Sequence, residues 1–164
     1  MLESNEAAAG GTVFVGGDSS LRSIASTFDS NTSNGGGGAV FVVGGGRFVA
    51  RDSTFVSNTA FGEGGAILNF GRVNISTSTF EGNRGLRGGA IKVGGLTGLV
   101  SISDSTRFSA NVAVANGAAI SSTTSSITLI DDAEFSDNIV EDGFGDLLFI
   151  GDVTFHRITN SSGA

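Results

Sequence analysis

Hydrophobic residues recur at every second position in short runs along most of the chain. One such run places Val73 and Ile75 before Phe80, and another places Val40 and Val42 before Phe48. Gly, Asn and Ser interrupt these runs after about four to six residues, a pattern typical of short, half-buried β-strands. No window combines a sustained helical period with capping residues. The pattern therefore predicts an all-β chain.

The apolar runs belong to a repeat that is clearest in residues 53–93. There a block of the form S-T-F-x-x-N is followed by G-G-A-I, and both blocks then return. Successive copies of the Phe are separated by 27, 25, 28 and 27 residues. The Phe column is Phe28, Phe55, Phe80, Phe108 and Phe135, and the Asn column, three residues later, is Asn31, Asn58, Asn83, Asn111 and Asn138. A period of this size is typical of stacked supersecondary units.

A unit of about 25 residues with two or three short strands, stacked on similar units, is one coil of a parallel β-solenoid. The sequence therefore predicts a parallel β-helix of about six coils of roughly 24–29 residues. In this interpretation residues 1–164 form a single β-helix domain. Residues 1–11 are a possible N-terminal cap, residues 12–158 form the coils, and residues 159–164 are a tail.

The residue types in the two columns fit this prediction. Phe side chains would stack inside the solenoid, each about 4.8 Å from its copy in the next coil. Asn tolerates a left-handed backbone and can hydrogen-bond to the next coil, so its column predicts a ladder at a turn. Because every coil repeats both columns, they indicate scaffold rather than a binding site.

The pairing of G-G-A-[ILV] with F-x-x-N resembles the repeats of the chlamydial polymorphic outer membrane proteins. The matching copies are residues 28–31 with 37–40, 55–58 with 64–67, and 80–83 with 88–91. The copies at 108–111 and 135–138 are weaker. The resemblance implies a right-handed β-helix with an adhesin-like role, outside the cell or at its surface. Residues 1–11 lack the basic start and apolar core of a signal peptide.

Composition removes several kinds of site from consideration. The chain has no Cys, and hence neither disulfides nor thiolate metal ligands, and its one His is His156. A single His leaves little room for a multi-histidine metal site or a serine–histidine triad. The apolar runs are too short and too often broken by Gly for a transmembrane helix, so direct membrane insertion is not expected.

Charge is distributed unevenly along the chain. The net charge is −7, and the whole imbalance lies in residues 129–164, which hold eight acids and one base. An acidic chain without a basic stripe is a poor candidate for binding nucleic acid. No cofactor is expected, although the acidic cluster from Asp131 to Asp152 offers oxygen ligands of the kind that Ca²⁺ takes. A solvated loop face is the reading we favour for that cluster.

Outward positions hold the candidate partner surface. If Val40 and Ile67 point inward, the residue after each points out. The outward column reads Phe14, Phe41, Leu68, Lys92, Ser121 and Leu148. Phe14, Phe41 and Leu68 would form an exposed apolar stripe, and such patches usually mark a partner site. A one-residue shift in register, or cover from a neighbouring loop, would remove that stripe.

Three functions from different classes remain open. The first is a non-enzymatic structural or adhesive module that contacts other proteins, or itself, through coil ends or the stripe. The second is a carbohydrate-active β-helix enzyme, for which Asp52 with Asp104 or Asp131 would need carboxylates about 5–10 Å apart. The third is ice binding by the column Thr27, Thr54 and Thr79, which continues as Arg107 and Glu134. We favour the first, because nearly the whole chain is used for scaffold.

Overall fold

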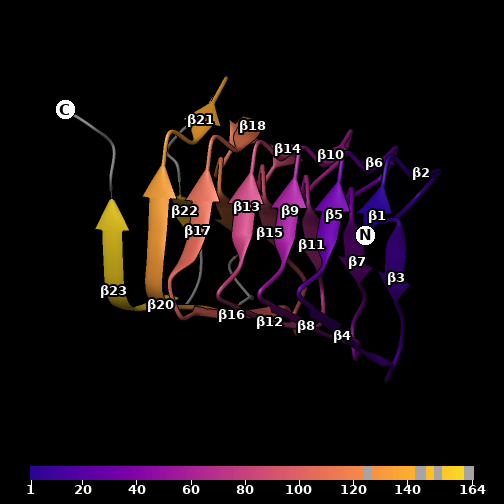
Figure 1. The fold of residues 1–164 in the computed structure, drawn as a ribbon, viewed down its shortest axis with the longest axis horizontal. Helices are drawn as coiled ribbons and strands as arrows, with labels where there is room; N and C mark the ends of the chain where they lie inside the picture. Colours follow the sequence, from indigo (N-terminus) through magenta and orange to yellow (C-terminus); the bar gives the residue numbers. More distant parts are fainter. Residues whose placement is uncertain (124–126, 143–146, 150–152, 161–164) are drawn as a thin grey trace.

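The computed structural model describes residues 1–123, 127–142, 147–149 and 153–160. These residues form β-strands, turns and bends and contain no helix. The strands are stacked side by side along the long axis of the molecule, with β1, β2 and β3 near one end and β23 at the other (Figure 1). Every paired strand is parallel to its neighbours, which confirms the predicted parallel β-solenoid.

The first sheet contains two columns of strands that meet at β20 (Ile127–Ser136). One column consists of β1 (Leu2–Glu3), β5 (Thr27–Asp29), β9 (Thr54–Val56), β13 (Thr79–Glu81) and β17 (Thr106–Ser109). The other consists of β4 (Ser20–Ile24), β8 (Arg47–Arg51), β12 (Arg72–Ser76) and β16 (Leu99–Ser103), and β23 (Val153–Asn160) pairs with β20.

Two further sheets complete the wall of the solenoid. The second is β2 (Glu6–Ala7), β6 (Thr32–Ser33), β10 (Thr59–Ala60), β14 (Arg84–Arg87), β18 (Val112–Asn116) and β21 (Ile139–Val140). The third is β3 (Val13–Val15), β7 (Val40–Val42), β11 (Ile67–Asn69), β15 (Ile91–Val93), β19 (Ile120–Ser122) and β22 (Leu147–Phe149). In β3 and β7 the residue after the aliphatic position, Phe14 or Phe41, is the most exposed of the three.

One coil contributes a strand to each of these four columns, as β7, β8, β9 and β10 do. The sequence pattern predicted two or three strands in each coil, because it did not show that the apolar run before the S-T-F block bends into a separate strand. The described residues make five complete coils between residues 13 and 140, with part coils on either side. The predicted number of about six includes these part coils.

The core is a set of stacked columns. The rings of the Phe column lie 4.6 to 5.0 Å apart, centroid to centroid, and within 10° of parallel. Phe48 packs edge-on against Phe28 and Phe55. The aliphatic column Val40, Ile67, Ile91 and Ile120 is fully buried beside it. Each buried side chain thus meets its copy in the next coil, which removes apolar surface from water along the whole stack.

Left-handed backbone recurs in three corner columns of the solenoid. The first corner column contains Ala25, Asp52, Thr77, Asp104 and Asp132, and the third contains Gly37, Gly64, Gly88 and Gly117. In the second, positive φ falls on Ser30, Ser57, Gly82, Ala110 and Asp137, the residues directly before the Asn column. The expectation that Asn itself would take this conformation was wrong by one residue, because Asn uses its side chain inside the turn.

Residues 1–11 stack on the first complete coil. β1 pairs in register with β5, and β2 pairs in register with β6. The side chain of Asn5 donates to the Oδ1 of Asn31 at 2.9 Å, which extends the Asn ladder into this segment.

Candidate functional site

The Asn column forms a continuous hydrogen-bonded ladder inside the solenoid. The Oδ1 of Asn83 accepts from the backbone N–H and the Nδ2 of Asn58, both at 3.0 Å. The Nδ2 of Asn83 donates to the carbonyl of Phe55 and to the Oδ1 of Asn111, both at 2.9 Å. Asn83 is fully buried, so these four bonds supply the partners that a buried amide requires. The ladder is saturated and offers nothing to a ligand.

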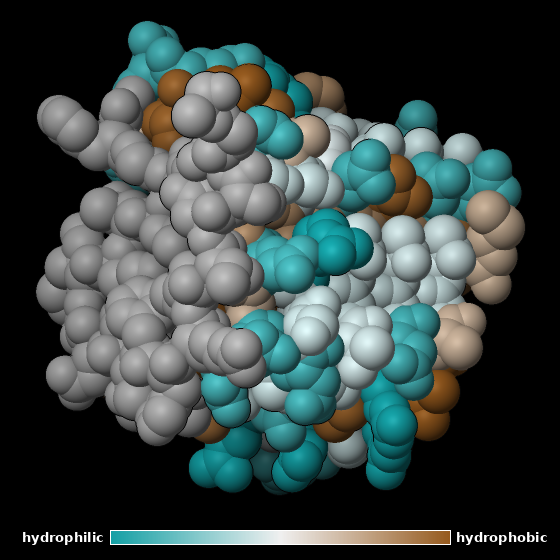
Figure 2. Space-filling view, turned by 60° about the vertical axis from the view of Figure 1, so that its left-hand side comes forward, coloured by the Kyte–Doolittle hydropathy of each residue, from teal (hydrophilic) through white to brown (hydrophobic). Residues whose placement is uncertain are grey.

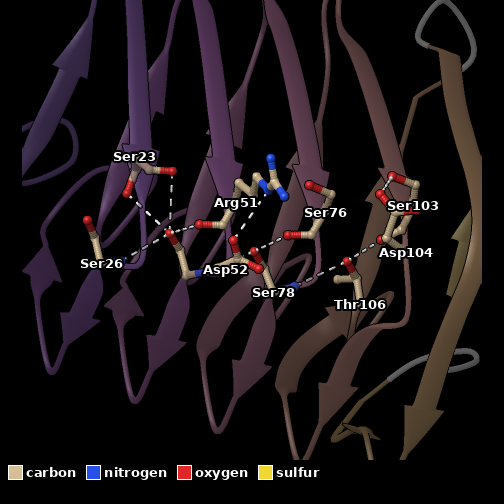
Figure 3. A network of polar contacts seen from close by, with 10 residues as sticks. Ser23, Ser26, Arg51, Asp52, Ser76, Ser78, Ser103, Asp104 and Thr106 are labelled. Atoms are coloured by element: carbon tan, nitrogen blue, oxygen red, sulfur yellow. Dashed lines mark hydrogen bonds and ion pairs between the residues drawn. The ribbon is translucent and has the colours of Figure 1, made fainter.

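A second ladder, of hydroxyl groups, runs along the first corner (Figure 3). The backbone N–H of Ser53 donates to Ser78 Oγ at 3.1 Å, and the backbone N–H of Ser78 approaches Thr106 Oγ1 at 3.4 Å. The hydroxyl of Ser78 in turn donates to the carbonyl of Ser76 at 2.7 Å. Sequence reasoning did not assign this role, although the Ser of the S-T-F block recurs in the same way as the Phe and Asn. These hydroxyls also serve the scaffold.

The outward stripe differs from its predicted form. Phe14 is 60% exposed, and its ring meets that of Phe41 edge-on at 5.5 Å. Phe41 is half-buried, because the corner at Gly10 lies against its ring. Leu68 is only 7% exposed, and its exposure was predicted wrongly. Its side chain lies so close to Gly36 that a Cβ there would stand 2.4 Å from Leu68 Cδ2.

Phe70 takes the place that the prediction gave to Leu68. Its ring meets that of Phe41 edge-on at 5.7 Å, so Phe14, Phe41 and Phe70 form a row of aromatic side chains on the outer face of the third sheet. We call these three residues the aromatic row. Phe70 lies outside the repeat columns, just after β11, so periodicity gave no signal for it.

Lys92 follows Leu68 in the outward column and is the only lysine in the chain. It is 4% exposed, and its Nζ donates to Ser121 Oγ at 3.1 Å. Burial lowers the pKa of Lys92, while nearby Glu63 acts to raise it and Arg87 to lower it. A hollow of about 440 Å³ opens beside Lys92 and is bounded on one side by Phe70.

Exposed apolar side chains occur elsewhere on the surface as well. Phe61 is 69% exposed and Leu86 is 39% exposed, at equivalent positions of adjacent coils. Leu96, after β15, is 86% exposed. On the face shown in Figure 2, apolar residues form separate brown patches between teal and white ones.

The threonine column is in register but short. Thr54 pairs with Thr27 on one side and with Thr79 on the other. The next two positions are Arg107 and Glu134, which form an ion pair at 2.8 Å. The array of three threonines therefore ends in charged side chains.

The carboxylates of the enzyme hypothesis lie along one edge of the solenoid. Asp52 and Asp104 occupy the first corner column in coils that are not adjacent, and both are exposed. Asp52 pairs with Arg51 at 3.3 Å, and Asp104 accepts from Ser103 at 3.0 Å. Asp131 is exposed beside this corner. These carboxylates follow one another along one edge of the solenoid, whereas a glycosidase places two carboxylates on either side of the bond that it cleaves.

The described residues contain no group of three or more His, Asp or Glu side chains that could hold a metal ion. Part of the acidic cluster from Asp131 to Asp152 lies outside the described part of the chain, because residues 143–146 and Asp152 are not described. Leu148 lies in β22, where the side chains are not described. Within the described ranges no helix is long and apolar enough to cross a membrane.

Residues 25–43 match the family model of the Chlamydia polymorphic membrane protein repeat. The chain carries a repeat of this class. The matched segment holds one complete copy of both blocks of the polymorphic membrane protein repeat, from Phe28 to Asn31 and from Gly37 to Val40. The predicted resemblance is thereby confirmed. No curated protein and no solved structure matches the chain.

Proposed function

We propose that the chain is a non-enzymatic structural or adhesive module, which contacts another protein or a cell surface through apolar side chains exposed beside its second and third sheets. The observation that carries the proposal is a contrast between two sets of side chains, those that repeat in every coil and the large apolar ones that do not. The repeated Phe, Asn, Ser and Gly positions are buried in core, ladders and corners. Large apolar side chains that the core does not need stand outside, with Phe14 at 60% and Phe61 at 69% exposure.

Two further points support the proposal. Exposed aromatic side chains are enriched where proteins meet partners, because they bury a large area at low conformational cost. The repeat class that residues 25–43 match is named for membrane proteins, which favours a place at a cell surface or outside the cell. The partner would be a protein, or a second copy of the chain.

The test is light scattering over a hundredfold dilution, combined with adhesion of chain-coated beads to cultured cells. We expect concentration-dependent association, bead adhesion, or both, and we expect the double variant F14S/F61S to reduce them at least fivefold. The matched control is S19A/S20A, which changes two exposed polar side chains.

Two results would overturn the proposal. One is a monomer at every concentration whose beads adhere no better than uncoated beads. The other is turnover of an acidic polysaccharide that disappears in the variant D52N/D104N, which would make the chain an enzyme.

A further inference from the structure

The hollow beside Lys92 has the features of a ligand site. It lies on the outer face of the third sheet, between the loop after β11 and β19, and its volume of about 440 Å³ is within the usual range for small-molecule sites. Its lining includes Glu63, Phe70, Arg87, Lys92, Asn116 and Ser121. The lining combines one aromatic ring with hydroxyl, amide and charged groups.

Lys92 is the group in this lining that most needs a partner. An ammonium has three N–H donors, and burying it without partners is costly. Lys92 is 4% exposed, and Ser121 Oγ is the one hydrogen-bond partner of its Nζ in the part of the chain that the structure describes. Two N–H donors of the Lys92 ammonium are therefore left for a ligand in the hollow, and the ammonium itself is largely shielded from water.

Charge in the hollow favours a monoanion. Arg87 donates to Glu63 at 3.1 Å, and the same carboxylate also stabilises the charge of Lys92, so two cations share one anion. Among the described residues, the lining therefore holds two cations and one anion, a net charge of one positive unit. A carboxylate matches that charge, whereas a phosphate dianion would exceed it and would also face the carboxylate of Glu63.

The walls indicate what the rest of the ligand would be. A Cβ on Gly94 would stand 2.7 Å from Cε1 of Phe70, so the ring packs directly against this glycine and supplies an apolar wall of the hollow. Asn116 and Ser121 supply polar groups elsewhere in the lining. A ligand with one apolar face and several hydroxyl groups would fit both the apolar wall at Phe70 and the polar groups of Asn116 and Ser121.

We propose that this hollow binds a small hydroxylated carboxylate of the sugar-acid type, with Lys92 holding the carboxylate and Phe70 contacting the apolar face of the ring. The site goes beyond the proposed module function and does not depend on it. It would bind its ligand whether or not the outer face also contacts a protein.

The single lysine makes a direct test possible. In protein labelled with ¹³C-lysine, the Hε–Cε signal reports Lys92 alone. We expect sodium glucuronate to shift this signal in a saturable way and to raise the pH at which it titrates. Glucose, which lacks the carboxylate, should leave the signal in place at the same concentration and ionic strength.

Variants separate the proposed site from a merely structural lysine. In calorimetric or saturation-transfer measurements, K92M should weaken glucuronate binding at least tenfold and F70A at least threefold. R72M, which removes an exposed cation from β12, should leave it unchanged. The proposal is wrong if glucuronate shifts the signal no more than sodium chloride does, or if K92M binds as well as the parent. Binding of inorganic phosphate as tight as that of glucuronate would refute the carboxylate assignment.

Discussion

A buried Asn side chain stabilises this fold only because the Asn residues of the preceding and following coils complete its hydrogen bonds. Removing one side chain from the Asn ladder leaves polar groups of two neighbouring coils without partners, and each buried group left unsatisfied costs about 1–3 kcal/mol. The cost of a single substitution therefore falls on three coils.

We expect Asn83→Ala to lower the free energy of unfolding by about 3 kcal/mol, since it removes four hydrogen bonds and leaves donors of Asn58 unpaired. Urea unfolding would measure the change. Asn74→Ala is the matched control, because Asn74 lies on the outer side of β12, and its effect should be under about 0.5 kcal/mol. Equal effects of the two substitutions would contradict the ladder's role.

Lys92 determines whether the free energy of unfolding rises or falls at alkaline pH. Burial lowers its pKa below the usual 10.5, so the folded state gives up this proton at a lower pH than the unfolded state. Between the two pKa values the unfolded state binds more protons, and stability must rise with pH there. The chain has no Tyr and no Cys, so few other groups titrate above about pH 9.

The expected result is that unfolding free energy increases from pH 9 toward pH 10.5 in the parent and stays flat in K92M. At pH 7, K92M should be more stable by about 1 kcal/mol, since a buried charge is replaced by an apolar chain of similar length. Urea titrations at a series of pH values would measure both. A parent that loses stability on alkalinisation relative to K92M would reverse the assigned direction.

For single residues, the sequence predicted the burial of the positions that repeat in every coil. The Phe and Asn columns could be located because each recurs at the same place in every unit. The burial of Leu68 could not be predicted, because it depends on the corner at Gly36 lying against its side chain. The burial of Lys92 depends on non-repeating neighbours such as Phe70. Their cover differs from coil to coil and leaves no periodic signal.

Among the structural elements, the corners impose the strictest requirements on residue type. Gly88 has φ of +67°, and a Cβ there would stand 2.2 Å from the carbonyl oxygen of Ile91. Gly82 has φ of +61°, but the nearest atom to its Cβ would be Ser57 Oγ at 3.8 Å. The two glycines share a conformation and differ in the space around them.

This pair separates backbone strain from steric exclusion. We expect Gly82→Ala to cost about 1 kcal/mol, which is the penalty of left-handed backbone for Ala. Gly88→Ala should cost about 3 kcal/mol or more, because the carbonyl must also move. Thermal unfolding of both variants would measure the difference. Similar losses would show that conformation alone selects Gly at the third corner.

The strands were predictable in kind but not in number. Alternation in a run such as Val73 and Ile75 indicates a strand, yet it does not show where a short strand bends. The bends occur at residues as varied as Ala25, Asp52 and Thr77. Since these residues share a backbone conformation and no side-chain chemistry, the sequence carries little sign of that corner.

For the molecule as a whole, equivalent coils imply that one can be removed without disturbing the contacts between the others. Deleting residues 64–87 would join Glu63 to Gly88 and bring the Phe and Asn columns of the flanking coils into contact in phase. Stability in such stacks is a sum of coil and interface contributions.

The deletion variant should fold to the same β-rich circular dichroism spectrum. Its urea m-value should fall by about a seventh, because the deletion removes 24 of the 164 residues and m follows the surface buried on folding. A deletion of residues 64–75 removes about half a coil and puts the columns out of phase, so that variant should fail to unfold cooperatively. If the first deletion also failed to fold, the coils would not be interchangeable.

The Asn ladder also has a direction. From Asn5 to Asn111, the side-chain amide of each Asn donates to the Oδ1 of the Asn in the coil that follows. The aligned side-chain dipoles reinforce one another, as in any chain of hydrogen bonds. A coil added after Asn138 must therefore bring an acceptor, and one added before Asn5 must bring donors. Any extension of the stack, by the same chain or by another molecule, is thus chemically polar and proceeds head to tail.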